Sequence, residues 1–319
     1  MSDTRHATRG ASTDAPRGRG APRRRPFWTL GRTDALTGYL FIAPQLLGVI
    51  VFVLFPVGLA IWYSLNEWNI FTGDMTFVGG ANYEAALNDP QLPSVLGATA
   101  VFSGGVVVLN IALGLVLAVM LNRRFKGVTL FRTLFFSPVV VSVVAWTLVW
   151  GFLLQDNGGI NGALAQIGVD GPNWLQSGPT AMIAVTFTQV VRSVGINMVL
   201  FLAALQGVPG ELYEAARLDG ASSRKVFTRI TLPLISPTLM LTAVITIVGA
   251  LQSFAQIAVL TEGGPGLSTT VLVFYVFQQA FSFNDIGYGS TLALMLLTFV
   301  MVLTILQWQL RRKWVFYED

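Results

Sequence analysis

The amino-acid sequence predicts an all-α, polytopic membrane protein with six transmembrane helices. Of the 319 residues, 53% are hydrophobic and only 11% are charged, which is far from the balance of a soluble globular domain. Six apolar stretches are long enough to cross a bilayer, which takes about 20 residues. The connections between them alternate between basic and acidic, as expected for a membrane protein with a fixed orientation.

The predicted spans are interrupted by few helix-breaking residues. Pro44, Pro56 and Pro138 lie near or inside apolar runs, where membrane helices tolerate proline. We expect a transmembrane domain over residues 37–319 with helices at about 39–64, 96–121, 133–154, 180–206, 236–260 and 287–310.

Residues 1–36 differ in composition from the rest of the chain. They are rich in Arg, Pro, Gly, Ser and Thr, and almost no large apolar residue precedes Phe27. Such a segment cannot bury enough apolar surface to fold alone, so it is predicted to be a disordered, Arg-rich cytoplasmic tail. Its basic residues suit contact with anionic lipid better than binding to nucleic acid.

The placement of charge predicts the orientation. Lys and Arg occur in the tail, in residues 123–132 and 217–229, and at the C-terminus, whereas residues 65–95, 155–179 and 261–286 contain acids and no Lys or Arg. The positive-inside rule therefore places both termini in the cytoplasm, together with the loop over residues 207–235.

Two features belong to the predicted outer loops. Residues Thr269–Phe281 are apolar but too few to span a bilayer, so we expect an interfacial or re-entrant helix. In the first outer loop, Asn82 is predicted to cap a short helix over Tyr83–Leu87.

The most polar internal segment runs from Pro209 to Pro237. Glu211–Leu218 is rich in strong helix formers, and the following Asp219-Gly220 pair favours a sharp turn. A second helix is expected after it, capped by Ser222 or Ser223, both of which precede the next helix-forming run.

Pro233 and Pro237 are expected to kink or restart the chain at the edge of the next apolar run. The segment is thus predicted to form a helical finger that carries charges of both signs. A finger of this shape suits a groove on a soluble partner.

The finger sequence resembles a known family. The run E-A-A-R-L-D-G-A over Glu214–Ala221, then Phe227, Pro233 and Pro237, is similar to the EAA loop of ABC importer permeases. With T-E-G-G-P at Thr261–Pro265, it resembles sugar-importer permeases of the maltose and glycerol-phosphate kind, most of all their first permease. Further similar stretches are Tyr39–Pro44, Asn82–Pro90, Gly127–Pro138, Gly195–Gln206, Tyr275–Phe281 and Gly287–Leu294.

The resemblance implies the type I ABC importer permease (MetI-like) fold. This chain lacks the large outer insertion and the extra N-terminal helices of the maltose relative, so contacts made by those parts do not carry over. It also has Val191 where the family usually has Trp, which leaves the packing near Arg192 open.

The resemblance further implies that the finger is the helix that docks on the ATPase. Glu214 would meet a basic residue of the ATPase, small residues would permit close approach, and Asp219 would bond nearby backbone amides. The basic residues Arg217, Arg224 and Lys225 are equally consistent with an ordinary solvated face. The predicted coupling residues are Glu214, Ala215, Ala216, Asp219, Gly220 and Ala221.

A sugar path needs hydrogen-bonding side chains within the membrane, which should face an interior cavity because they are costly in lipid. Helical spacing predicts that Thr246, Gly249, Ser253 and Gln256 share one face. The alternative is that such small polar residues serve helix packing. The predicted path residues, partly from the resemblance, are Val194, Gly195, Asn197, Met198, Thr246, Gly249, Ala250, Gln252 and Ser253.

Gln189 and Arg192 are further candidates for the path or for a partner contact. Arg192 is the only basic residue well inside a predicted span, and no acid lies within any of the six spans. It must therefore meet backbone carbonyls, water, a partner chain or an anionic substrate such as glycerol phosphate.

We therefore expect the permease of a binding-protein-dependent importer of a di- or oligosaccharide, in the bacterial cytoplasmic membrane. The resemblance implies four partners besides lipid: a second permease, an ATPase dimer, an extracellular solute-binding protein and the sugar. No nucleic acid is expected. ATP and Mg would bind the ATPase, with no cofactor on this chain. The alternative substrate is glycerol 3-phosphate or another polyol.

Two other classes fit the sequence less well. With no Cys and a single His in the tail, the chain has no thiol chemistry, His metal site or His-based triad. A membrane-embedded enzyme would usually need a carboxylate pair, and the outer acids are scattered. A secondary transporter would need intramembrane carboxylates and usually inverted repeats, and neither is found. Loss of Glu214 would separate the classes.

Overall fold

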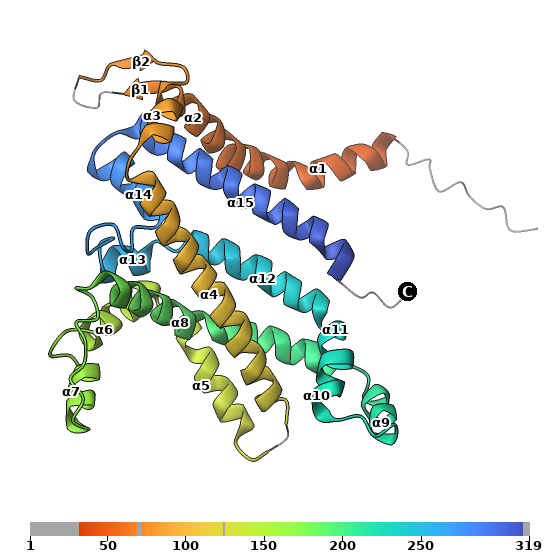
Figure 1. Cartoon of the computed structure of the whole chain (residues 1–319). Helices are drawn as coiled ribbons and strands as arrows, with labels where there is room; N and C mark the ends of the chain where they lie inside the picture. The colour runs from red at the N-terminus through yellow and green to blue at the C-terminus, as the bar shows by residue number, and fades with distance from the viewer. Residues whose placement is uncertain (1–31, 69–71, 124, 315–319) are drawn as a thin grey trace, which may run out of the picture. The chain divides into compact units, whose positions relative to one another are not determined.

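The computed structural model describes residues 32–68, 72–123 and 125–314, which are mostly helical (Figure 1). The chain divides into two compact units, Met1–Phe55 and Pro56–Asp319. Helix α1 (Arg32–Val49), a π-helical turn (Ile50–Leu54) and α2 (Phe55–Ser64) follow one another without a break. Within them, Thr37–Ser64 is apolar and long enough to cross a membrane, in agreement with the first predicted span.

The predicted tail lies almost wholly outside the described residues. Only its last residues, 32–36, are described, and they are helical as the start of α1. The first helix therefore begins earlier than the sequence predicted, while Pro44 lies inside it without ending it.

Three long helices dominate the second unit: α4 (Leu92–Leu121), α8 (Gly178–Gly207) and α15 (Ile286–Trp314). They cover three predicted spans with slightly wider bounds. Helices α4 and α8 pack closely, since a Cβ added to Gly114 would lie 3.0 Å from Cβ of Asn197. Small residues allow such close approach between membrane helices.

The predicted span 133–154 is not one helix. It divides into α5 (Val128–Val140) and α6 (Val143–Leu153), which are bent by 101°. The break follows Pro138 and lies in a run of valines around Ser142, and both features disfavour a continuous helix.

The predicted span 236–260 is also interrupted. Helix α12 (Ser236–Leu251) ends well before residue 260, and α13 (Ala255–Leu260) follows after a break. In the break, the ring of Phe254 lies 4.9 Å from that of Phe277 and 5.9 Å from that of Phe274. Aromatic packing between distant segments thus overrides the continuous helix that the sequence favours.

Sharp bends between helices affect the number of spans that can be counted. Among the described residues, four helices are long and apolar enough to cross a membrane, or up to six if each bent pair is one span. The second bent pair joins Ser223–Leu234 to Ser236–Leu251 at 67°, so the kink predicted near Pro233 and Pro237 is confirmed.

Short elements complete the end of the molecule that holds α3 (Figure 1). Strands β1 (Asn66–Trp68) and β2 (Met75–Phe77) pair in an antiparallel register with Asn66 opposite Phe77, which the all-α prediction missed. Helix α14 (Leu272–Phe277) continues into a π-helical turn (Gln278–Ser282) and is too short to span, as predicted. Helix α7 (Gly159–Gln166) follows α6 and lies away from α3 in Figure 1.

The predicted role of Asn82 is wrong. Helix α3 (Ala81–Asn88) begins two residues before the predicted start at Tyr83, and Gly80 at its N-cap makes no side-chain capping bond. Asn82 Nδ2 instead donates to the carbonyl oxygens of Ser64 at 2.9 Å and Asn66 at 3.1 Å. The side chain therefore joins α3 to the end of α2 and to β1.

The finger consists of α9 (Gly210–Leu218), α10 (Ser223–Val226), a π-helical turn (Phe227–Thr231) and α11 (Leu232–Leu234). It lies beyond the ends of α8 and α12 (Figure 1). The predicted turn is confirmed, with Gly220 at φ +70°. Ser222 occupies the N-cap position of α10, but its side chain makes no capping bond.

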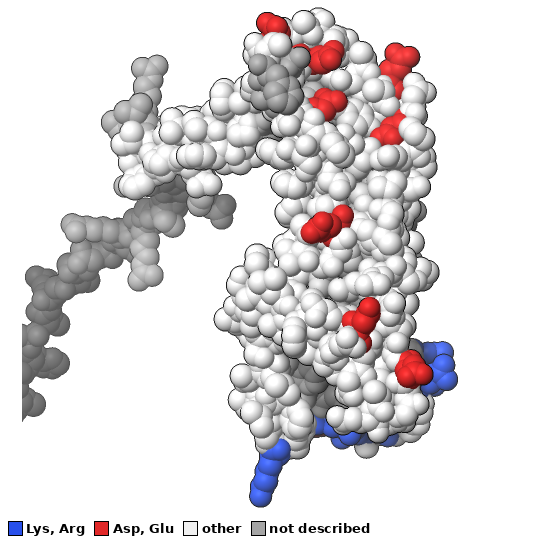
Figure 2. Space-filling model, turned by 90° about the vertical axis from the view of Figure 1, so that its left-hand side faces the viewer, with Lys and Arg blue, Asp and Glu red and all other residues white. Residues whose placement is uncertain are grey.

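The charged residues separate along the second unit. We call the loops 65–95, 155–179 and 261–286 the acidic end, and residues 123–132 with the finger the basic end. On the face drawn in Figure 2, Lys and Arg gather at the lower end, whereas Asp and Glu are spread from the upper end downward.

Candidate functional site

The finger presents most of its predicted coupling residues to solvent. Glu214, Ala215, Asp219 and Gly220 are exposed, whereas Ala216 is buried and Ala221 is partly buried. Leu218 is 89% exposed, an unusual setting for a leucine at the tip of a charged helix. This surface is open to a partner.

Backbone hydrogen bonds within the finger stabilise its turn. The turn is closed by bonds from the N–H of Gly220 to the carbonyl of Arg217 and from the N–H of Ala221 to the carbonyl of Ala216, both 3.0 Å. Among the described residues, no backbone N–H is found to donate to the Asp219 carboxylate; the backbone N–H of Asp219 itself donates to the carbonyls of Ala215 and Arg217, so the expected side-chain bond is not formed. The hydroxyls of Tyr213 and Thr231 lie 3.2 Å apart and join α9 to the returning chain.

Two predicted path residues form a buried bond between helices. Asn197 of α8 donates from Nδ2 to Oγ1 of Thr246 on α12 at 3.1 Å, and the two residues are 4% and 8% exposed. Sequence spacing alone could not pair them, because they are far apart in the chain.

A second buried network joins α8 to the break after α12. The hydroxyl of Ser253 donates to Oε1 of Gln256 at 3.0 Å, and Nε2 of Gln256 donates to Oε1 of Gln189 at 2.5 Å. All three side chains are buried. The network consists of neutral groups that satisfy one another, which limits the cost of burying them.

The predicted common face of the fifth span is wrong in part. Because α12 ends at Leu251, Ser253 lies in the break and Gln256 on α13, so neither continues the α12 face of Thr246 and Gly249. Gly249 and Gln252 are exposed. The structure thus separates the polar path candidates that are buried from Gly249 and Gln252, which are exposed.

The remaining path candidates are buried in helix contacts. Val194, Met198 and Ala250 are each at most 7% exposed. A Cβ on Gly195 would overlap the carbonyl oxygen of Phe135, so this glycine permits α8 to cross α5. Close crossing of this kind is the packing alternative that the sequence left open.

Arg192 is partly buried on α8, and its Nε is a buried donor with no hydrogen-bond partner within the described part of the chain. Its neighbour Ser193 is bonded, donating to Asn110 Oδ1 of α4 at 3.2 Å and to the carbonyl of Gln189 at 2.7 Å. A buried guanidinium N–H without a hydrogen-bond partner is costly. This N–H can therefore donate to an acceptor supplied from outside the chain.

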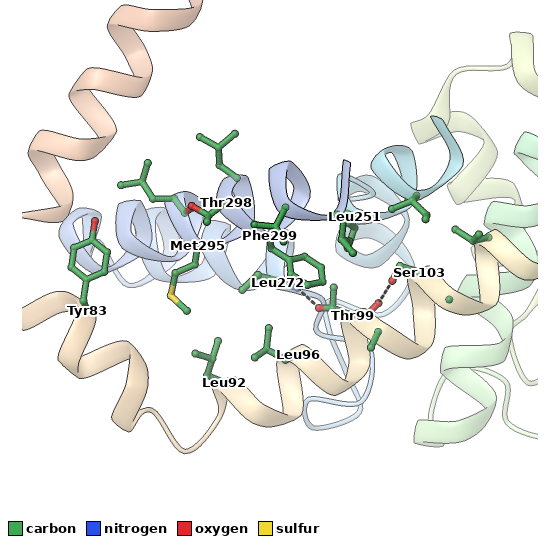
Figure 3. A pocket seen from close by; sticks show the side chains of 18 of the residues that line it. Tyr83, Leu92, Leu96, Thr99, Ser103, Leu251, Leu272, Met295, Thr298 and Phe299 are labelled. Carbon is green, nitrogen blue, oxygen red and sulfur yellow. Dashed lines mark hydrogen bonds between the residues drawn. The ribbon is translucent and has the colours of Figure 1, made fainter. Parts of the chain in front are cut away.

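A large cavity of about 1150 Å³ lies between α2, α4, α12 and α15, and it is not suited to a sugar (Figure 3). Its lining is almost wholly apolar. The hydroxyls of Thr99 and Ser103 are already bonded to carbonyls of their own helix, to Val95 and Thr99 respectively, each at 2.6 Å. Such a cavity suits hydrocarbon.

Sequence reasoning missed a hydrogen-bonded cluster of three side chains at the acidic end, Asp89, Tyr275 and Tyr288, which we call the tie. Oδ2 of Asp89, at the end of α3, accepts hydrogen bonds from the hydroxyls of Tyr275 on α14 and Tyr288 on α15, both at 2.6 Å. Oδ1 accepts the N–H of Gln91 at 2.8 Å. The signal in the sequence was an acid and Tyr275 in loops expected to lie on one side, with Tyr288 at the start of the last predicted span.

The tie changes the ionisation of its members. Burial opposes the charge on Asp89, but the hydrogen bonds from Tyr275, Tyr288 and the backbone outweigh it and hold the pKa of this carboxyl below its ordinary value. Burial, together with the bond to Asp89 and its charge, raises the pKa of Tyr275 to about 12. The carboxylate is therefore charged and the phenol is neutral at physiological pH.

Comparison with known proteins decides the family. Residues 110–315 match the family described as "Binding-protein-dependent transport system inner membrane component". The chain belongs to this family of ABC importer permeases. It is thus a membrane-spanning transport subunit and not itself an enzyme, as the sequence predicted.

Relatives of this permease include sugar and glycerol-phosphate transport proteins. It is 36% identical over 272 residues to the trehalose/maltose transport system permease protein MalF of Thermococcus litoralis, covering 85% of this chain and 91% of the relative. It is 33% identical over 278 residues to the multiple sugar-binding transport system permease protein MsmF of Streptococcus mutans, covering 86% and 95%. For the sn-glycerol-3-phosphate transport system permease protein UgpA of Escherichia coli O157:H7, the values are 33% over 282 residues, 88% and 95%.

Solved structures confirm the fold of this permease. A bacterial ABC transporter involved in the import of the acidic polysaccharide alginate matches with a TM-score of 0.76 and 22% identity, over 88% of this chain and 96% of that one. The predicted MetI-like permease fold is therefore confirmed. It is mostly helical, with a two-stranded sheet that the prediction lacked and the bent pair α5 and α6 in place of the straight span 133–154.

Proposed function

We propose that this permease forms the sugar path of an ATP-driven importer together with a second permease, and that its finger docks on a cytoplasmic ATPase. A solute-binding protein would deliver the sugar from outside. The observation that carries the proposal is the finger surface, where motif residues Glu214, Ala215 and Gly220 are exposed beside the exposed Leu218. An exposed leucine with small neighbours and a carboxylate suits a partner's groove.

The proposed path uses the buried polar networks on α8, α12 and α13. Asn197 with Thr246, and Gln189 with Gln256 and Ser253, are neutral hydrogen-bonding pairs that a sugar's hydroxyl groups could replace. Alternating access would then follow from different binding of the sugar in two states of the transporter. ATP and Mg would bind to the ATPase, and this chain would bind no cofactor.

One observation favours the alternative of an anionic polyol such as glycerol phosphate. The buried Nε of Arg192 has no acceptor among the residues that the structure describes, and a phosphate would supply one. The acidic end, through which the substrate would enter under the proposed orientation, carries no basic residue and counts against an anion.

Co-purification tests the proposal directly. The tagged chain is extracted gently from its own membrane as wild type, Glu214→Ala and Glu211→Ala, and the accompanying proteins are identified. Glu211 is a matched control, because it is an exposed glutamate on α9 outside the motif. We expect a second permease and an ATPase with wild type and Glu211→Ala, and loss of the ATPase from Glu214→Ala. A wild type that purifies without a nucleotide-binding partner would contradict the proposal.

The proposed orientation has its own test, which the absence of cysteine makes free of background. Single cysteines replace Ser223 in the finger and Asn284 at the acidic end, both exposed. In intact cells, a membrane-impermeant maleimide should label the cysteine at 284 and not the one at 223. The reverse pattern would place the finger outside and exclude ATPase docking.

A further inference from the structure

A polar cleft of about 640 Å³ opens at the acidic end, separate from the networks on α8 and α12. It is formed where α3, α14 and the start of α15 come together (Figure 1). Its volume falls in the range of small-molecule sites. The polar and aromatic residues that line it include Asn88, Asp89, Gln91, Tyr275, Gln279, Phe283, Asp285 and Tyr288.

The cleft offers hydrogen-bond acceptors on its tyrosines and carboxylates and amide donors on residues such as Gln91 and Gln279. The hydroxyl protons of Tyr275 and Tyr288 are both used on Asp89 Oδ2, so the two phenol oxygens can only accept a further bond. Asp285 accepts the N–H of Tyr288 at 3.0 Å through one of its two oxygens. A ligand that fits these groups must therefore both donate and accept hydrogen bonds.

Charge narrows the class of ligand. Within the part of the chain that the structure describes, no Lys, Arg or His lines the cleft, while two carboxylates do. The pKa of Asp89 is lowered by its hydrogen bonds, so this carboxylate stays ionised at neutral pH. A phosphate or carboxylate group would be repelled and would have no proton to donate, whereas a sugar hydroxyl both donates and accepts.

The rim of the cleft supplies an aromatic face. Phe283 is 67% exposed, which is costly for a free phenylalanine in water and useful where an apolar ring face can cover it. Amides, carboxylates and an aromatic ring around one concave site are the groups expected to recognise a polyhydroxylated ring.

We propose that this cleft is a site at the mouth of the permease for neutral saccharides, which discriminates against phosphorylated and acidic sugars. It deepens the proposed function and depends on it for the direction of transport. Substrate would meet this site before reaching the buried networks. The site would therefore filter substrates by charge at the outer surface.

Phe283→Ala and Phe281→Ala form a matched pair for the test. Both side chains are similarly exposed, at 67% and 69%, and the two residues are two positions apart, but only Phe283 lines the cleft. Neither has a partner in the tie around Asp89, so both variants should keep the fold. Thermal unfolding of the purified full chain checks this point.

The test measures ligand binding to the full chain in lipid nanodiscs by saturation-transfer NMR. The neutral probes are maltose, maltotriose and raffinose, and the anionic probes are glycerol 3-phosphate and trigalacturonate. We expect binding of at least one neutral probe and of neither anion. Phe283→Ala should weaken that binding about fivefold, the size of an aromatic contact, and Phe281→Ala should leave it unchanged.

Three outcomes would overturn the inference: no neutral probe binds, an anionic probe binds as well as the neutral ones, or both Phe variants behave alike. Partner co-purification on the same preparations keeps the two proposals apart. A wild type that retains its ATPase but binds no saccharide overturns only the cleft. A wild type that binds saccharide through Phe283 but has no ATPase overturns only the importer.

Discussion

Several polar groups of the acidic end are bonded within the chain, whereas the acidic residues of the finger are exposed. At the acidic end, Asp89 is bonded to two tyrosines and a backbone N–H, and Asn82 bridges two further segments. In the finger, Glu214 and Asp219 are exposed and Leu218 is almost fully so. The acidic end is thus stabilised by its own chain, whereas the finger surface is available to another protein.

This difference between the two regions predicts that one determines the stability of the chain and the other its assembly with partners. Substitutions at the acidic end should change the free energy of unfolding, because they remove bonds within the chain. Substitutions on the exposed face of the finger should leave folding unchanged, because surface changes away from packed features cost little. Their effect should be seen in partner binding, and the following predictions test this division from the largest expected effect to the smallest.

Gly287→Leu should cause the largest loss of stability. A Cβ at this position would overlap the carbonyl oxygen of Asn66, which belongs to a backbone segment that cannot move freely. Overpacking of this kind costs about 3 kcal/mol. Unfolding in mixed detergent micelles measures the change.

Gly97→Leu is the control for Gly287→Leu, because nothing lies within 4 Å of a Cβ added at Gly97. Equal loss of stability in the two variants would show that the acidic end is not the rigid part of the molecule.

Leu218→Asp should weaken ATPase binding about 30-fold, or about 2 kcal/mol, as expected for an anchor residue at the centre of an interface. The leucine is 89% exposed, so the free energy of unfolding should change by less than about 0.5 kcal/mol. Titration of the ATPase onto the purified permease measures the affinity. Reduced stability with unchanged affinity would reverse the proposed roles of the two regions.

Tyr275→Phe should cost about 1.5 kcal/mol at neutral pH, because it removes a bond to a charged carboxylate. The pKa of Tyr275 is raised from 10.0 to about 12 in the folded chain, so the stabilising effect of its proton is complete below pH 10 and lost as the pH rises to about 12. The stability difference between wild type and Tyr275→Phe should decline over this window.

Asp89 titrates in the acid range, in contrast to Tyr275. Its pKa is lowered on folding, so its contribution is present above the unfolded pKa of about 3.9 and is lost only at more acid pH. The difference between wild type and Tyr275→Phe should therefore be constant from about pH 5 to pH 10. A difference that already changes near pH 7 would contradict this assignment.

Loss of the hydrogen bond between Asn197 and Thr246 should have the smallest effect on the free energy of unfolding. Both residues are buried, yet hydrogen bonds between membrane helices contribute only about 0.6 kcal/mol on average. A double-mutant cycle with Asn197→Leu and Thr246→Val isolates this coupling from the effect of each change alone. A coupling above about 2 kcal/mol would show that the pair stabilises the fold strongly.

Sequence reasoning was most successful where the signal was local. Apolar runs located α4, α8 and α15, and the Asp219-Gly220 pair located the turn of the finger. It failed at the breaks after Val140 and Leu251, where a run that is apolar enough to span is bent by packing and by proline. Hydropathy measures length and polarity, and neither reveals a bend.

The candidate sites divide in the same way. The exposed coupling residues could be named from the motif, since the finger is a short, local element. The partners of Asn197, Gln256 and Asp89 could not, because each bond joins residues that are distant in the chain. The side chain of Asn82 was misplaced for the same reason, since its partners lie on α2 and β1.

The sequence by itself determined that this chain is a helical membrane permease with a polar finger, because hydrophobicity, charge placement and turn residues act over short distances. The tertiary structure alone decided which polar groups meet. Pairing two amides between helices, or one carboxylate with two tyrosines, depends on how α8, α12, α14 and α15 pack, and packing is set by the contacts of the whole fold rather than by any local run.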